Sequence, residues 1–219
     1  MWGPLTDHLS SKRRLLIPDL PGHDRSSAMP YESHDETIAH LVEAVRAHCS
    51  EPVTVVGFSL GAQLAILLAA RHPELVRAVV AISAQAVPAR FPTATLALLR
   101  VASPLAQNER FARLQAKELF IPASLFPAYL RTSRGISQRT LLASVKENIT
   151  FVPPAGWASF PGRSLILAGD DERSVMRASA ERLAATHPRS ELEIVEGCGH
   201  GIPLQRPEWL ACRLDSWRG

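Results

Sequence analysis

Short apolar runs alternate with amphipathic segments along most of the chain. Runs of this kind, rich in β-branched residues and leucine, predict buried strands at residues 15–17, 52–56, 78–82, 164–168 and 191–195. The spacing of apolar residues and helix propensity predict helices at residues 35–48, 62–70 and 174–186. Short strands that alternate with helices are typical of a mainly parallel, doubly wound α/β sheet.

Residues 87–157 interrupt this alternation. They contain several helical segments separated by prolines, and Ser137 is placed to cap a helix that runs through Asn148. A chain of 219 residues is long enough for one domain, or for one domain with an insertion. We therefore predict one α/β domain over residues 1–219, with a helical cap at residues 87–157 inserted after the third strand.

The composition excludes several classes of function. Hydrophobic residues make up 46% of the chain and charged residues 21%, which is typical of a globular protein. The net charge is only +3, and the basic residues form no stripe of the kind that binds nucleic acid. No apolar run is long enough to span a membrane, and the N-terminus does not start a signal peptide. Cys49, Cys198 and Cys212 lack metal-ligand spacing, so we expect reduced thiols in a cytoplasmic protein and no bound metal.

The most specific motif is the pentapeptide Gly57-Phe58-Ser59-Leu60-Gly61. A predicted strand precedes it and a predicted helix follows it. A serine in so tight a connection has a strained backbone, and small neighbours let the strand approach the helix. We predict that Gly57 and Gly61 meet that need, and that Ser59 projects from a nucleophile elbow at the carboxyl end of the strand.

Two further motifs follow Ser59 in an informative order. An acidic run at residues 170–172 comes after the strand at 164–168, and His200 lies between two glycines after the last strand. A serine hydroxyl becomes a good nucleophile when an imidazole takes its proton, and the imidazole needs a carboxylate to fix its tautomer. Open α/β sheets place their sites at the carboxyl ends of the strands, so we expect these loops to meet there.

The order nucleophile, acid, histidine resembles that of the α/β-hydrolase fold family, and in particular its capped serine esterases and lipases. Three other stretches are similar to family loops: Pro18–His23 to the loop after its fourth strand, Ala70–Val76 to the exit from its nucleophile helix, and Gly199-His200 with Pro203 and Pro207-Glu208 to its histidine loop. The resemblance covers essentially the whole chain.

The resemblance implies a role for each candidate residue. Ser59 would be the nucleophile, His200 the general base, and the backbone N–H of Leu60 one donor of the oxyanion hole. The family usually places aspartate three residues after the glycine that ends the strand, and here that position is Glu172. We expect Glu172 to be the acid, with Asp171 and Asp170 as alternatives. His23 is expected to be a structural loop residue.

The family also carries a strand and a His-Gly-type turn that would precede the region resembling Met1–Ser11, and this turn donates the second oxyanion N–H. From its absence we expect one of two arrangements. Either the sheet has a gap beside the strand at 52–56, or the strand at 15–17 moves across to fill it. We also expect Met1 to be an internal methionine of a longer reading frame.

These observations predict a serine hydrolase without a cofactor that cleaves a carboxylic ester or related acyl bond of a small molecule. Thioester, lactone and carbon–carbon bond hydrolysis, and acyl transfer, fit the same residues. The alternative is a non-catalytic or weakly active binding member of the fold, because the second oxyanion segment is absent. We expect no nucleic-acid partner, and the sequence makes no prediction of oligomeric state.

Overall fold

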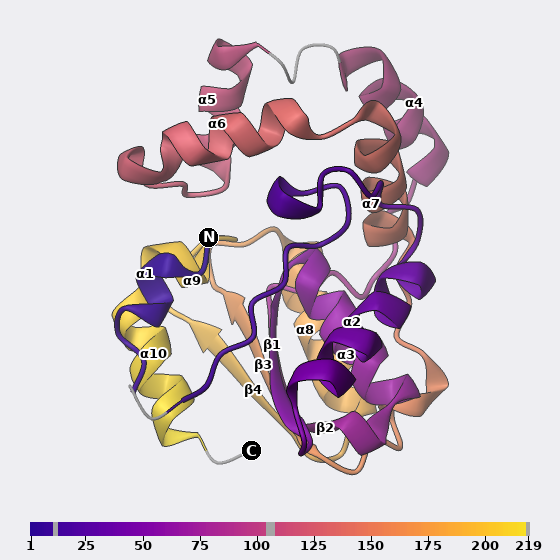
Figure 1. The fold of residues 1–219 in the computed structure, drawn as a ribbon, viewed down its shortest axis with the longest axis vertical. Helices are drawn as coiled ribbons and strands as arrows, with labels where there is room; N and C mark the ends of the chain where they lie inside the picture. The colour runs from indigo at the N-terminus through magenta and orange to yellow at the C-terminus, as the bar shows by residue number, and fades with distance from the viewer. Residues whose placement is uncertain (11–12, 104–107, 218–219) are drawn as a thin grey trace.

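A sheet of four parallel strands lies at the centre of the computed structural model, which describes residues 1–10, 13–103 and 108–217 (Figure 1). Residues 104–107 of the predicted cap lie outside the described part. The strands are in the order β1-β2-β3-β4, with bounds β1 (Val53–Phe58), β2 (Val76–Ile82), β3 (Arg163–Gly169) and β4 (Ser190–Val195). The parallel sheet and its flanking helices confirm the predicted α/β class.

Helices occupy most of the sequence between the strands. They are α1 (Gly3–Thr6), α2 (His34–His48), α3 (Leu60–Arg71), α4 (Pro92–Ala102), α5 (Glu109–Glu118), α6 (Phe126–Gly135), α7 (Gln138–Thr150), α8 (Ser174–Thr186), α9 (Ile202–Gln205) and α10 (Pro207–Ser216), with short 3₁₀ turns η1 (Asp24–Ser26), η2 (Pro73–Leu75), η4 (Ala123–Leu125) and η5 (Ala155–Trp157). Ser137 caps α7 as predicted, since its side chain accepts a hydrogen bond from the Thr140 N–H. Among the described helices, none is both long enough and apolar enough to cross a bilayer.

The alternation of side chains along the strands produces two hydrophobic cores, one on each face of the sheet. In β2, Val79 and Ala81 pack into a core with α2, α3 and α8, whereas Val80 and Ile82 pack into a core with α1, α9 and α10. Helices therefore cover both faces (Figure 1). Helices α4 to α7 lie between β2 and β3 in sequence, within residues 87–157, which we call the cap segment.

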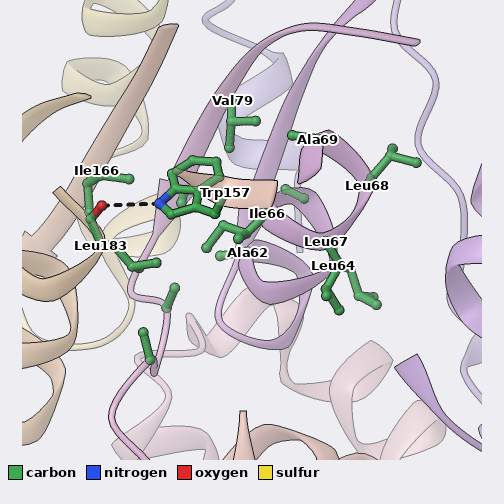
Figure 2. Close-up of a cluster of buried hydrophobic side chains, with 14 of the residues drawn as sticks. Ala62, Leu64, Ile66, Leu67, Leu68, Ala69, Val79, Trp157, Ile166 and Leu183 are labelled. Atoms are coloured by element: carbon green, nitrogen blue, oxygen red, sulfur yellow. Dashed lines mark hydrogen bonds between the residues drawn. The ribbon is translucent and has the colours of Figure 1, made fainter. Parts of the chain in front are cut away.

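Trp157 anchors the end of the cap segment in the core (Figure 2). Its side chain is fully buried, its ring stacks on Phe160 with centroids 6.0 Å apart, and its indole N–H donates to the Leu183 carbonyl at 3.1 Å. The hydrogen bond satisfies the one polar atom that burial of the indole would otherwise leave unpaired. Trp157 thereby joins the cap segment to α8.

A buried polar network joins the cap segment to α2 and α3. The Tyr31 hydroxyl lies 2.5 Å from His34 Nδ1, and His34 Nε2 lies 3.1 Å from Gln63 Oε1. Gln63 Nε2 donates to the carbonyls of Gln85 and Asn148 at 2.7 and 3.0 Å. Because buried polar groups are costly when unpaired, this network favours one position of α7 on α3. Burial lowers the pKa of His34, although the nearby Glu147 partly opposes that effect.

The prediction of a strand at residues 15–17 is wrong. The segment forms no ladder with the sheet, and Leu15, Leu16 and Ile17 are 41–47% exposed. The described residues place no strand between this segment and β1, so the segment has no adjacent strand with which its backbone can form hydrogen bonds. The segment does not move across to pair with β1, so the second expected arrangement is not found. One side of β1 is left without a strand, and its residues 53–56 are only half-buried.

We predict that acid destabilises the fold through two buried histidines, His34 and His187. Burial lowers the pKa of each. Each therefore binds more protons when unfolded, so the free energy of unfolding should fall as the pH drops below about 6.5. Urea unfolding at about pH 7.5 and about pH 5.5 measures this fall. His34→Gln should show a smaller fall than the wild type, whereas Gln in place of the exposed His8 should leave it unchanged. Equal falls in His34→Gln and the wild type would contradict the prediction.

Candidate active site

Ser59 occupies a strained turn between β1 and α3. Its φ is +53°, in the region that side chains other than glycine rarely adopt. The turn is held from both sides: the Ser59 N–H donates to the Ile82 carbonyl at 2.9 Å, and the Ser59 carbonyl accepts from the Ala62 N–H at 3.0 Å. Strain of this kind persists only where the surroundings over-determine the backbone, and it is frequent at functional sites.

The two glycines of the motif differ in their importance. A Cβ on Gly57 would collide with the backbone of Gly61 and Ala62, so β1 and α3 can approach only because Gly57 has no side chain. A Cβ on Gly61 would meet nothing within 4 Å. The prediction that both positions must be small holds for Gly57 and is wrong for Gly61, whose free side faces open space.

His200 lies within hydrogen-bonding distance of Ser59. His200 Nε2 and Ser59 Oγ are 3.0 Å apart, and the two residues are separated by 141 positions in the sequence. The imidazole also packs against the Phe58 ring, with centroids 5.1 Å apart. His200 is half-buried, so the contact between serine and histidine is still open to a small molecule.

Of the three candidate acids, Glu172 is the one that the structure brings to His200. Glu172 Oε1 lies 3.3 Å from His200 Nδ1. The Glu172 side chain is fully buried, and neither carboxylate oxygen has a hydrogen-bond partner among the described residues. A buried carboxylate is costly unless it is paired, and the imidazole is the group placed to pair with it. Contacts in unliganded sites are often longer than in the reacting complex.

The other two candidate acids, Asp170 and Asp171, contact the backbone of the histidine loop instead of the His200 ring. Asp170 Oδ1 accepts a hydrogen bond from the Cys198 N–H at 3.2 Å, and backbone N–H groups, that of Gly197 first, lower the pKa of Asp170. Asp171 is exposed, and its N–H donates to the Cys198 carbonyl at 3.0 Å. Both residues therefore tie the acidic loop to the backbone of the histidine loop.

Sequence reasoning missed two groups that hold these loops. Arg177, in the first turn of α8, donates from Nη1 to the carbonyls of Asp170 and Glu172 at 2.7 and 2.6 Å. Gln205 Oε1 accepts from the Gly199 N–H at 3.0 Å. Neither residue lies in a motif, so the sequence carried no signal for them. His23, expected to be structural, contacts the Pro21 carbonyl through Nδ1 at 2.9 Å.

Phe120 brings the cap segment against the histidine loop. It lies between α5 and α6 with a φ of +56°, and a Cβ on Gly199 would collide with its ring. A Cβ on Gly201 would lie 2.8 Å from Phe120 Cβ and 3.0 Å from the Leu119 carbonyl oxygen. The positions on either side of His200 therefore require glycine, because Phe120 occupies the space that a side chain would need.

The arrangement can transfer a proton from Ser59 Oγ to His200 Nε2 at the carboxyl edge of the sheet. The described residues contain no group of three or more His, Cys, Asp or Glu side chains that could hold a metal ion.

Comparisons with known proteins show what the chain is similar to in sequence and fold. A model of the "Alpha/beta hydrolase family" matches residues 1–213. A pimeloyl-[acyl-carrier protein] methyl ester esterase from Nitrosomonas europaea is 28% identical over 99% of this chain and 89% of its own length. The biotin biosynthesis bifunctional protein BioHC from Cellvibrio japonicus is 24% identical over 99% of this chain, which spans 44% of that relative. A thermophilic esterase from Thermogutta terrifontis shares the fold, with a TM-score of 0.79 at 16% identity over 99% of this chain and 83% of that one.

We predict that Gly199→Ala destabilises the protein by about 1–3 kcal/mol, because the methyl group overpacks the space held by Phe120. Combining it with Phe120→Ala should cost less than the sum of the two single changes. Gly61→Ala, which puts the same methyl group into open space, is the matched control and should not destabilise. Urea unfolding of the four variants and the wild type measures the coupling. Additive effects of Gly199→Ala and Phe120→Ala would show that the two residues do not interact.

Proposed function

Because its residues 1–213 match the family model, the chain belongs to the alpha/beta hydrolase family, and we propose that it is a serine hydrolase that cleaves a carboxylic ester or a related acyl bond. The observation that carries the proposal is the line of contacts from Ser59 Oγ through the His200 ring to Glu172, at 3.0 and 3.3 Å. Curated relatives named as hydrolases and esterases support the general class.

In the first step of the proposed reaction, Ser59 Oγ attacks the carbonyl carbon of the substrate while its proton passes to His200 Nε2. The resulting tetrahedral intermediate carries a negative oxygen. Collapse of this intermediate breaks the bond to the alcohol, which takes the proton from His200 as it leaves. The acyl group remains on Ser59 as an ester.

In the second step, water attacks the acyl-enzyme and gives its proton to His200 Nε2. The new tetrahedral intermediate collapses with return of a proton to Ser59 Oγ, and the carboxylic acid leaves. Every proton and electron pair is accounted for by Ser59, His200, the substrate and water, so the proposed reaction needs no cofactor.

The backbone N–H of Leu60 is the proposed donor to the negative oxygen. Leu60 is the first residue of α3, and the first N–H groups of a helix have no carbonyl partner within it. The amino end of a helix also favours negative charge. In this proposal a short apolar turn holds the nucleophile and a stabilising donor on adjacent residues.

Glu172 is the proposed acid. Its buried carboxylate would fix His200 with the Nδ1 proton inward and would stabilise the imidazolium formed at each attack. Arg177 would position this residue through the loop backbone, since its guanidinium contacts the Glu172 carbonyl rather than the side chain. We propose that the substrate is a small acyl compound and that the protein acts in the cytoplasm. We also propose that the cap segment is an insertion in a single domain.

We predict that Ser59→Ala lowers kcat/KM for short- and medium-chain p-nitrophenyl esters by at least about 1,000-fold, because no other group can form the acyl-enzyme. Ser27→Ala, at an exposed serine, is the matched control and should retain full activity. A fluorophosphonate probe should label the wild type and Ser27→Ala, and should not label Ser59→Ala. Equal rates for Ser59→Ala and the wild type would instead favour a non-catalytic or weakly active binding protein.

We predict that Glu172→Gln lowers kcat by at least about 100-fold with an unchanged melting temperature or a higher one, since an amide removes a buried charge but cannot stabilise the imidazolium. Asp171→Asn, at an exposed carboxylate, should retain full activity. Asp170→Asn should lower the melting temperature more than kcat, because Asp170 accepts from the loop backbone. If Asp170→Asn or Asp171→Asn loses activity and Glu172→Gln does not, Glu172 is not the acid.

A further inference from the structure

The cap segment carries an excess of positive charge because acidic residues are scarce in it. Residues 87–157 contain nine Lys and Arg against three Asp and Glu, a formal charge of +6. The rest of the chain contains 15 basic and 18 acidic residues, a formal charge of −3. The net charge of +3 therefore conceals a basic cap segment on an acidic body.

The cations of the cap segment are all exposed, and most have no acidic partner. Two form ion pairs: Arg113 with Glu109 and Arg139 with Glu32, each at 2.6 Å. Seven form no ion pair with any described residue: Arg90, Arg100, Arg110, Lys117, Arg131, Arg134 and Lys146. Arg90 lies over the Phe91 ring at 5.1 Å from its centroid, and none of the seven is neutralised by an acidic side chain of the described residues.

Helix α4 presents a second, outward apolar face. The helix packs against α7, and Leu96 and Leu99 are half-buried on one of its faces. Ala94, Leu98 and Val101 share the opposite face at spacings of four and three residues, and all three are exposed, Leu98 by 72% and Val101 by 80%. Phe91, at 64% exposure, extends this face at the start of the helix.

Helix α5 also presents an exposed apolar side chain, here with cations beside it. Arg110, Leu114 and Lys117 share one exposed face, with the leucine at 66% exposure between the two cations. The opposite face contains the buried Ala112 and Ala116. Both α4 and α5 lie at the same end of the long axis of the molecule, away from the sheet (Figure 1).

We propose that this end of the cap segment docks on an anionic lipid surface. Phe91, Leu98, Val101 and Leu114 would enter the boundary between headgroups and acyl chains, and the cations beside them would meet the headgroup charges. The positive charge of the cap segment is complementary to an anionic surface, and the protruding apolar side chains fit a deformable surface. The apolar side chains project from convex helices, so a bilayer can accommodate them where a protein partner would need a matching groove.

The proposal is independent of the proposed reaction, because lipid binding can be measured without activity. The wild-type protein should sediment with vesicles of phosphatidylcholine and phosphatidylglycerol in equal parts, and not with phosphatidylcholine alone. Added salt should weaken the binding, because it screens the contribution of the cations.

Two paired variants separate the contributions of apolar side chains and charge. Leu98→Gln with Val101→Gln, and Arg110→Gln with Lys117→Gln, should each weaken vesicle binding by at least about tenfold. Met29→Gln with Arg182→Gln, which changes an exposed methionine and an exposed arginine outside the cap segment, is the matched control and should bind like the wild type. All the substituted side chains are exposed, so thermal unfolding should be unaffected.

Three outcomes would overturn the proposal. The first is equal sedimentation with both kinds of vesicle or with neither. The second is unchanged binding of the Leu98 and Val101 variant, which would leave a purely electrostatic contact without insertion. The third is binding to soluble polyglutamate without binding to vesicles, which would point to an acidic protein partner.

Discussion

The common direction of the four strands is the constraint on which the site depends. Because the strands are parallel, β1, β3 and β4 deliver Ser59, the acidic run and His200 to one edge of the sheet. Backbone hydrogen bonds continue past the strand ends: Ser59 N–H to the Ile82 carbonyl at 2.9 Å, and Asp170 N–H to the Val195 carbonyl at 3.2 Å. The loops of the site are thus held by hydrogen bonds that continue those of the sheet. These bonds set the distances between the side chains of Ser59, Glu172 and His200.

The sequence was a good guide wherever a local pattern decided the structure. The helix at 174–186 has the predicted bounds, and the strand–serine–helix motif places Ser59 where it was expected. The prediction of a strand at 15–17 was wrong because apolar residues indicate that a segment favours burial. They do not indicate whether a neighbouring strand is present to pair with it. The contact of Phe120 with Gly199 could not be predicted, since it depends on how the cap segment folds back across some eighty positions of sequence.

The cap segment is attached to the body by groups of two kinds. Trp157 fastens one end of it through apolar packing and a single hydrogen bond to the Leu183 carbonyl. Gln63, in the first turns of α3, donates one hydrogen bond to the Asn148 carbonyl of α7 and one to the Gln85 carbonyl, which precedes the cap segment. Phe120, which follows α5, packs against the glycines of the histidine loop, so a displacement of α5 would be felt beside His200.

The open edge of β1 has a consequence for how the protein fluctuates. β1 is bonded to β2 on one side, and among the described residues no strand protects its other side. Its outward amides must find water, so they should exchange hydrogen with solvent faster than those of β2, which has a neighbour on each side. We therefore expect β1, which ends one residue before Ser59, to open more readily than β2. The conformation of the turn at Ser59 is kept by α3 and β2 rather than by strands on both sides of β1, and Ser59 lies at the less stable margin of the sheet.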